Sequence, residues 1–297
     1  MSLRRVVQLL ALGSLAASAS AELTNVIHNE RSLYRNIYVT QEGDERCMLF
    51  RTRHNIGRET CMFLSAPNRH VFDYTQMMLA GLFLNPRPAR VLVIGLGGGT
   101  IPRTLARLSP ASRIDTVELD PSVVNIADKY FGFRPGGRTS ITVSDGRVFV
   151  KRRMKTPVKY DLVMLDAFDG DYVPEHMLTQ NFLQEVRSIM APGGVLVANT
   201  FSSGALYPHE SVTYQSVFGT FYNLKAGNRV IVARNGPLPP AALVRRNAAA
   251  LDRPLRETGT TAGKLLGQMT TRRDWDPKTR VLTDQYSPSN VLNAQRP

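Results

Sequence analysis

Apolar residues in the middle of the chain fall into short continuous runs that alternate with amphipathic stretches. Residues 91–94 form one such run, and residues 160–169 contain a second one. Continuous apolar runs of this length are typical of strands buried on both faces of a parallel sheet. Further strands are predicted at residues 113–120, 140–143, 195–200 and 229–233, and helices at 70–84, 101–108, 121–131, 177–190 and 209–221. Strands that alternate with helices in this way predict an α/β fold with a doubly wound, mostly parallel sheet.

The pattern changes on both sides of this region. Residues 36–40 and 46–51 alternate between apolar and polar positions around a turn, which predicts a β-hairpin. Near the other end, the proline-rich segment 237–240 leads into an alanine- and arginine-rich helix at 241–255. We therefore expect four parts: a signal-like segment at 1–21, a small β-hairpin domain at 22–68, the α/β domain at 69–235 and a helical extension at 236–297.

The first 21 residues have the layout of an export signal. Arg4 and Arg5 give a positive start, residues 6–17 are mostly apolar, and Ala19-Ser20-Ala21 supplies a small-x-small cleavage site. The alternatives are a start codon placed too early and an amphipathic tail. The pattern favours export, which for a bacterial chain means the periplasm.

The chain contains two cysteines, Cys47 and Cys61, in neighbouring predicted strands. In an oxidising compartment they would pair across a hairpin. The alternative is that they are two small buried hydrophobic side chains, and from the sequence we prefer this second interpretation slightly.

Composition narrows the class of protein. A chain of 297 residues with 43% hydrophobic and 21% charged residues can bury a full core. No stretch approaches ~20 uninterrupted apolar residues, so no membrane span is predicted. The net charge is +13, but the arginines are scattered over the whole length and are not interleaved with aromatic residues. We attribute this charge to a general richness in arginine and expect no nucleic-acid partner.

A glycine-rich loop joins the strand at 91–94 to the helix at 101–108. A strand, a glycine loop and a helix in this order bring backbone close to a nucleotide-like ligand, although a tight turn has the same residues. Glu118 ends the next strand, where a carboxylate can bind ribose hydroxyls. The dinucleotide fingerprint would need glycine where Thr100 stands, whereas Gly-x-Gly-x-Gly is typical of S-adenosylmethionine-dependent enzymes. The loop reads Gly95-Leu96-Gly97-Gly98-Gly99-Thr100.

Carboxylates also end two other predicted strands. Asp166 and Asp169 follow the apolar run of residues 160–169, and ligands of open α/β sheets bind at such carboxyl ends. Two carboxylates three residues apart, beside a cationic cofactor, are suited to hold and deprotonate an amine. The alternatives are a polar strand end for Asp166 and an Asp-Gly turn for Asp169. Asp145 follows the strand at 140–143, where it would either contact an adenine amino group or cap the next helix.

Together these motifs resemble the spermidine synthase (polyamine aminopropyltransferase) family, in particular a bacterial spermidine synthase-like branch. The resemblance runs from about residue 27 to residue 233 and includes the N-terminal β domain. It implies a methyltransferase-like Rossmann sheet of seven strands. The residues that carry it are Tyr74 with Gln76-Met77, Gly97-Gly98-Gly99, Glu118, Asp145-Gly146, Asp166-Ala167-Phe168-Asp169-Gly170 and Leu282-Thr283-Asp284-Gln285-Tyr286-Ser287-Pro288.

The resemblance also implies how the donor is bound. The glycine loop would hold the donor, Glu118 its ribose hydroxyls, and Asp145 with Gly146 its adenine. Two positions depart from the family pattern. Thr100 stands where members carry an aspartate near the amino group of the donor, and Glu59 is the nearest match to a donor-contacting glutamine.

On the acceptor side, the resemblance implies that Asp166 is the catalytic base and that Asp169 helps to bind the polyamine. Tyr74 matches a tyrosine of the acceptor site, and Gln76 is expected beside it. Alternatively, Tyr74 is a packed aromatic residue without a role in binding.

The leading hypothesis is aminopropyl transfer from decarboxylated S-adenosylmethionine to a diamine such as putrescine. The second is a methyltransferase that uses intact S-adenosylmethionine, because Thr100 in place of an acid suits a donor that keeps its carboxylate. The third is a non-catalytic binder of a polyamine or nucleoside. None of these needs a metal. A homodimer is expected by resemblance. The export signal favours the periplasm, whereas supply of the cofactor favours the cytoplasm.

Overall fold

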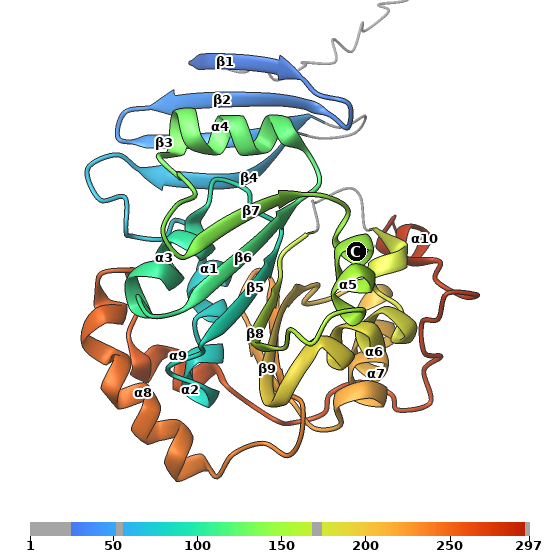
Figure 1. The fold of residues 1–297 in the computed structure, drawn as a ribbon. Helices are drawn as coiled ribbons and strands as arrows, with labels where there is room; N and C mark the ends of the chain where they lie inside the picture. The colour runs from blue at the N-terminus through green and yellow to red at the C-terminus, as the bar shows by residue number, and fades with distance from the viewer. Residues whose placement is uncertain (1–24, 52–55, 168–173, 295–297) are drawn as a thin grey trace, which may run out of the picture.

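The chain folds around two β-sheets in this computed structural model, which describes residues 25–51, 56–167 and 174–294 (Figure 1). A four-stranded antiparallel sheet from the N-terminal part lies beyond one end of a seven-stranded, mostly parallel sheet. The predicted export signal at residues 1–21 and the predicted polyamine-binding residue Asp169 lie outside the described residues.

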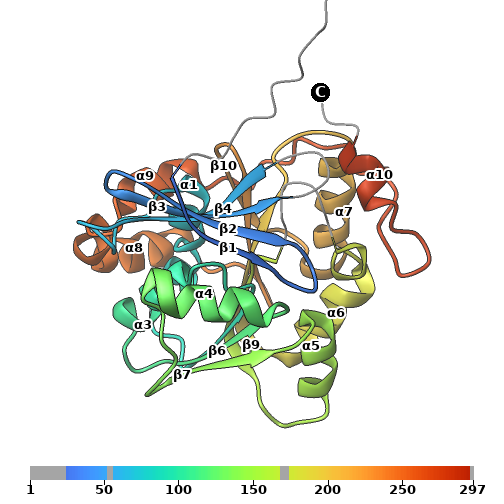
Figure 2. The ribbon, with the colours of Figure 1, turned by 90° about the horizontal axis from the view of Figure 1, so that it is seen from above.

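The smaller sheet has its strands in sequence order: β1 (Val26–Arg31), β2 (Asn36–Glu42), β3 (Glu45–Arg51) and β4 (Ile56–Phe63). The predicted hairpin is confirmed as β2 and β3. Alternate residues such as Ile37, Val39 and Met48 are fully buried and pack against helix α4 (Pro121–Phe131). Figure 2 shows α4 alongside the small sheet, and the apolar contact between them joins this sheet to the α/β part of the molecule.

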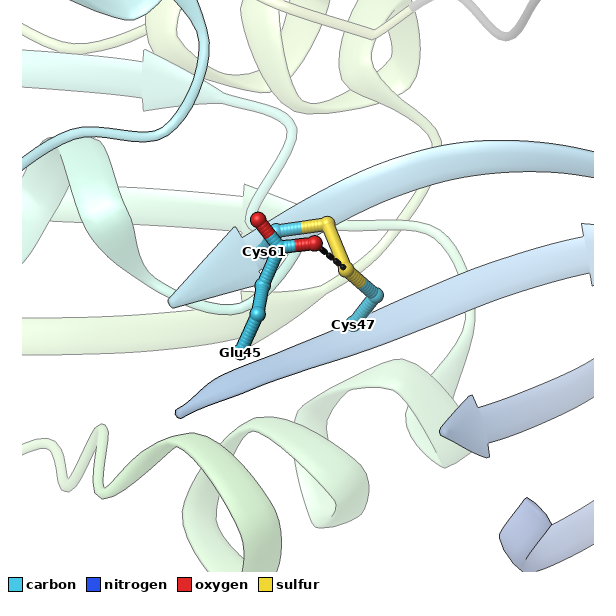
Figure 3. Close-up of side chains that lie close together, drawn as sticks. All are labelled: Glu45, Cys47 and Cys61. Atoms are coloured by element: carbon cyan, nitrogen blue, oxygen red, sulfur yellow. Dashed lines mark hydrogen bonds between the residues drawn. A yellow bond between two sulfur atoms is a disulfide. The ribbon is translucent and has the colours of Figure 1, made fainter. Parts of the chain in front are cut away.

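Cys47 of β3 and Cys61 of β4 are opposite each other in the strand register and form a disulfide (Figure 3). The preference for two unbonded cysteines is therefore wrong, because antiparallel pairing places the two side chains within bonding reach. Glu45 lies close to both sulfurs, and carboxylates and cysteine sulfurs are side-chain groups that can bind metal ions. However, bonded sulfurs are not thiolates, and Arg58 Nη2 lies 3.2 Å from Sγ of Cys47 and 3.0 Å from Sγ of Cys61. The cluster therefore offers no thiolate to a metal.

The larger sheet has the strand order β10-β11-β9-β8-β5-β6-β7. Its strands are β5 (Arg90–Ile94), β6 (Arg113–Glu118), β7 (Thr139–Val143), β8 (Tyr160–Leu165), β9 (Met190–Thr200), β10 (Tyr222–Lys225) and β11 (Arg229–Arg234). β5 to β9 are parallel, whereas β11 pairs antiparallel with β9 and β10 antiparallel with β11. The predicted doubly wound, mostly parallel sheet of seven strands is confirmed, although the short strand β10 lies where no strand was predicted.

Helices cover both faces of this sheet. One face carries α1 (Asp73–Met78), α2 (Gly81–Leu84), α3 (Thr100–Leu108), α8 (Ala241–Arg256) and α9 (Ala262–Gln268). The other carries α5 (Gly146–Met154), α6 (Gln180–Ile189) and α7 (Leu206–Phe218). The helix predicted at 70–84 is divided into α1 and α2, because the N–H groups of Leu79 and Ala80 bond to carbonyls three residues back, as in a 3₁₀ turn.

The C-terminal extension contacts both faces of the molecule (Figure 1). Leu251 and Leu255 of α8 belong to the core on one face. The chain then continues to the opposite face, where Trp275 stacks on Phe221. Leu282 packs in a small cluster beside α6 and α7, and the last helix, α10 (Ser289–Ala294), follows it. Within the described ranges, no helix has both the length and the apolar character needed to cross a bilayer.

Candidate active site

A pocket opens at the carboxyl ends of β5, β6 and β8, and it encloses roughly 1160 Å³ when its open mouth is included. Parallel strands end at one edge of a sheet, so the loops that follow them converge there. The small sheet covers this edge and contributes its own side chains to the lining. The residues from the larger sheet that line the pocket include Gly95, Gly97, Thr100, Glu118, Asp145, Gly146 and Asp166.

The glycine loop lies close to other parts of the protein. Gly95 has a φ of +99°, and a Cβ at this position would lie 2.0 Å from the carbonyl oxygen of Asp166. Gly99 has a φ of +78°, and its Cβ would lie 2.3 Å from the ring of Phe133. Both positions therefore require glycine. Gly98 and Gly99 shape the loop without lining the pocket, and the lining resumes at Thr100, the first residue of α3.

Glu118 connects the end of β6 to the glycine loop. Its Oε2 accepts a hydrogen bond from the N–H of Leu96 at 2.9 Å, and its Oε1 accepts one from the N–H of Asp120 at 3.0 Å. Burial raises the pKa of Glu118, whereas these backbone donors and the charge of Arg35 lower it. The carboxylate is thus fixed at the pocket wall with lone pairs still available for hydroxyl donors.

Asp145 caps a helix and also lines the pocket. It is the N-cap of α5, since its Oδ1 accepts from the N–H of Val148 at 2.9 Å, and it also lines the pocket. Its Oδ2 lies 2.9 Å from Nε2 of His176, which is a further lining residue. The cap is confirmed, and contact with adenine stays a prediction. His176 belongs to the 3₁₀ helix η1 (Glu175–Met177), and no motif identified it in the sequence.

Asp166 stands directly after β8, with its carboxylate held by two polar side chains. Oδ1 accepts from Nδ2 of Asn199 at 3.0 Å, and Oδ2 accepts from the hydroxyl of Tyr74 at 3.4 Å. Burial raises the pKa of Asp166 to about 6, although both hydrogen bonds lower it. Such a group is ionised at neutral pH but remains a better proton acceptor than an ordinary aspartate.

Tyr74 lines the pocket between two carboxylates. Burial raises its pKa well above the usual value, and the negative charges of Asp166 and Glu59 raise it further. The phenol therefore stays protonated and serves as a hydrogen-bond donor. Both carboxylates, Asp166 and Glu59, line the same pocket as Tyr74, and so does the cation Arg35.

The structure does not bring Gln76 to the pocket. Its side chain is buried on another side of α1, where Nε2 donates to the carbonyl of His70 and Oε1 accepts from Lys264 Nζ, both at 3.4 Å. The preceding residue, Thr75, lines the pocket instead. One residue corresponds to about 100° around a helix, so neighbouring positions face different surroundings.

The small sheet contributes lining residues that the sequence patterns did not identify, apart from Glu59. Arg35 and Phe50 both line the pocket, and the guanidinium carbon of Arg35 lies 4.3 Å from the centre of the Phe50 ring. Thr60 of β4 also lines it, close to Gly97. These residues reach the site because the small sheet packs on helix α4, and this long-range contact leaves no local signal in the sequence.

Comparisons with known proteins agree with this arrangement. The chain is similar to a polyamine aminopropyltransferase of Vibrio vulnificus (strain CMCP6), with 43% identity over 98% of this chain and 100% of the relative. Among solved structures, human methyltransferase-like protein 13 in complex with SAH has a TM-score of 0.56 and 28% identity, over 74% of this chain and 100% of that one. A probable spermidine synthase from Corynebacterium glutamicum ATCC 13032 has a TM-score of 0.64 at 20% identity, over 86% and 98%, which is a likeness of fold.

The family model described as "Spermine/spermidine synthase domain" matches residues 71–223, which include β5 to β9 and every pocket residue of the larger sheet named above. Together with the 43% identity along nearly the whole chain, this match shows that the chain belongs to the spermine/spermidine synthase family.

Proposed function

We propose that the chain is a polyamine aminopropyltransferase, which transfers an aminopropyl group from decarboxylated S-adenosylmethionine to a diamine such as putrescine. The single observation that carries this proposal is the buried Asp166, whose pKa is raised to about 6, in the pocket that Gly95, Gly97 and Glu118 also line. The relative from Vibrio vulnificus, which bears the name of this activity, supports it.

The donor would lie along the carboxyl ends of the strands. Glu118 is proposed to accept hydrogen bonds from the ribose hydroxyls, because its two oxygens are fixed by backbone donors at the pocket wall. Asp145 is proposed to accept from the adenine amino group. The backbone of Gly95 and Gly97 also lines the pocket, with no Cβ to keep the donor away.

The reaction needs a base that takes a proton from the amine and a pocket that orients the amine for attack. The amine nitrogen attacks the carbon next to the sulfonium, so a C–N bond forms, the C–S bond breaks and neutral methylthioadenosine leaves. An aliphatic amine with a pKa near ~10 is mostly protonated at neutral pH, so it must lose a proton. Asp166 is proposed to accept this proton, and Tyr74 to keep the carboxylate in place. Asp169 is proposed to pair with the distal ammonium of the diamine.

Two carboxylates in the pocket support a decarboxylated donor. Glu59 and Asp166 line the same pocket as Tyr74, and both charges raise the pKa of its hydroxyl. A donor that ends in an ammonium group gains from these charges, whereas the carboxylate of intact S-adenosylmethionine would be repelled. Glu59 is thus proposed to supply the negative charge that Thr100 does not.

The methyltransferase alternative is kept because the chain is also similar to human methyltransferase-like protein 13. The deciding experiment uses the purified protein with putrescine and decarboxylated S-adenosylmethionine, and intact S-adenosylmethionine in parallel. We expect release of methylthioadenosine only when both putrescine and the decarboxylated donor are present. Formation of S-adenosylhomocysteine from the intact donor, without release of methylthioadenosine, would support the methyltransferase.

Three further features remain proposals: cleavage of the export signal after Ala21, assembly into a homodimer, and the division of the chain at residues 68 and 235. The mass of the mature chain tests the first, and light scattering of the purified protein tests the second. Limited proteolysis that cuts near these two residues would support the third.

A further inference from the structure

The C-terminal segment contacts residues behind the pocket wall through the carboxylate of Asp284. Its Oδ1 and Oδ2 accept two parallel hydrogen bonds from Arg147, at 2.8 and 2.7 Å. Oδ1 also accepts from the hydroxyl of Thr179 at 2.7 Å, and the N–H of Asp284 donates to Asn181 Oδ1 at 3.1 Å. Planar, bidentate pairing of this kind fixes geometry as well as charge.

Arg147 is the centre of this arrangement. It is only 7% exposed and lies in the first turn of α5, two residues after Asp145. Besides Asp284, it donates to both oxygens of Glu185, at 2.8 and 2.7 Å, and to the carbonyl of His176 at 2.9 Å. Its pKa is raised by Glu185 and Asp284, so it is a permanent cation.

The His176 contact leads directly to the donor pocket. Arg147 holds the backbone carbonyl of His176, and the imidazole of the same residue lies 2.9 Å from Asp145 Oδ2. Both His176 and Asp145 line the pocket at the end proposed for adenine. A chain of short polar contacts therefore runs from the C-terminal segment to the pocket wall.

The same segment fixes η1 from a second side. Ser287 donates to the carbonyl of Glu175 at 3.1 Å, and Asn290 donates to the Glu175 carboxylate from its backbone N–H at 3.0 Å and from Nδ2 at 3.1 Å. Thr179, which Asp284 contacts, caps α6 through the N–H of Phe182 at 3.1 Å. The C-terminal segment thus contacts η1, α5 and the start of α6.

We propose that Asp284 is a positioning residue for the adenine end of the donor pocket: through Arg147 and the backbone of His176, it holds Asp145 and His176 in the arrangement that binds the nucleoside. This inference rests on the proposed function. Asp284 is 137 residues from Arg147 in the chain, and its side chain is not in the pocket lining, so it acts only through other residues.

An Asp284→Asn change should leave the fold intact, because Arg147 keeps Glu185 as a counter-charge. The amide, however, replaces one acceptor by a donor that faces the guanidinium, so the bidentate pair is lost. Loss of a charge-assisted hydrogen bond that orients a binding wall corresponds to roughly a tenfold change in affinity.

The test measures methylthioadenosine binding to the full chain by calorimetry, together with kcat and KM for the donor. For Asp284→Asn we expect about tenfold weaker methylthioadenosine binding, a similar rise in donor KM and a kcat within about twofold of the wild type. The conservative variant Asp284→Glu should recover part of the affinity.

Asp274→Asn is the matched control. Asp274 belongs to the same segment and anchors it to the protein body through Lys225 Nζ at 2.5 Å and the hydroxyl of Tyr207, and neither partner lines the pocket. We expect Asp274→Asn to change Tm about as much as Asp284→Asn does, but to leave methylthioadenosine binding unchanged. Unchanged binding by Asp284→Asn would overturn the inference, and so would equal weakening by both variants. Absence of binding by the wild type would instead overturn the proposed function.

Discussion

Replacement of Asp166 by Asn should produce a protein that is more stable but nearly inactive. The pKa of Asp166 is raised from 3.8 to about 6 by burial, so the neutral form of this carboxyl is more favourable in the folded protein than in the unfolded chain. Each pH unit between the folded and unfolded pKa values corresponds to 1.36 kcal/mol, which gives about 3 kcal/mol of destabilisation when the group is ionised. Because the residue also lines an open pocket, solvent reduces this cost, and we expect about 1 to 3 kcal/mol.

The sign of this effect depends on pH. Since the folded pKa lies above the unfolded value, the cost is absent below about pH 4 and complete above about pH 6 to 7. Asparagine carries no charge at any of these values and can still accept the hydrogen bond from Asn199. The Asn variant should therefore have a Tm higher by roughly 2 to 6 °C at pH 7.5, and the difference should shrink clearly at pH 4.5.

Activity should change in the opposite direction. Removal of a general base lowers turnover by about 10² to 10⁴, while methylthioadenosine binding should stay within about threefold of the wild-type value. In the wild type, kcat/KM for the amine should fall about tenfold for each pH unit below about 6, because Asp166 must be ionised to accept a proton.

Scanning calorimetry at the two pH values and a pH series of initial rates make these measurements. Asn199→Asp is not a suitable control because it adds a charge beside Asp166, so we choose Asp276→Asn, an exposed aspartate outside the pocket lining. A Tm that does not rise in Asp166→Asn at pH 7.5, or that rises equally at both pH values, would contradict the assignment of the raised pKa to Asp166. A kcat reduced no more than donor affinity would show that Asp166 is structural.

Three other changes test the rest of the site. Glu118→Gln should weaken methylthioadenosine binding about tenfold or more, measured by calorimetry, because the amide loses acceptor capacity for both the loop N–H and the ribose hydroxyls. Glu59→Gln should lower the preference for the decarboxylated over the intact donor by about tenfold in competition binding; an unchanged ratio would assign selectivity to other groups. In a double Cys47→Ser, Cys61→Ser variant, the free energy of unfolding measured with urea should fall by about 3 kcal/mol, because the disulfide closes a loop with a sequence separation of 14. Reductant should then not lower the stability of this variant any further.

The donor side of the site was predictable from sequence for a topological reason. Parallel strands have their carboxyl ends at one edge of a sheet, so residues that end separate apolar runs must meet there. Glu118 ends one such strand and Asp145 follows another, and both line the pocket, as does Asp166 on the acceptor side. Their grouping needed no knowledge of side-chain packing, only correct identification of each strand end.

Residues that come from other elements carried no such signal. Phe50 belongs to β3 and Arg35 to the connection between β1 and β2, and their place in the pocket depends on how the small sheet packs on α4. Within α1, the sequence likewise did not show whether Gln76 or Thr75 lines the pocket. A motif places the short helix at the pocket but does not fix its rotation, and one position around α1 decides which side chain lines the site.

The disulfide and the Asp284–Arg147 pair both depend on contacts between residues that are separated in the sequence. The partnership of Cys47 with Cys61 follows from the register of β3 on β4, and a register shifted by one residue would point the two side chains to opposite faces. The motif around Asp284 is recognisable in sequence, but its function is not, since it contacts neither Glu118 nor Asp166. Its importance follows only when Arg147 is seen to connect it to the carbonyl of His176. We propose that the motif around Asp284 and the motifs inside the pocket serve one requirement, a rigid wall for the nucleoside. The comparison of Asp284→Asn with Asp274→Asn tests this directly.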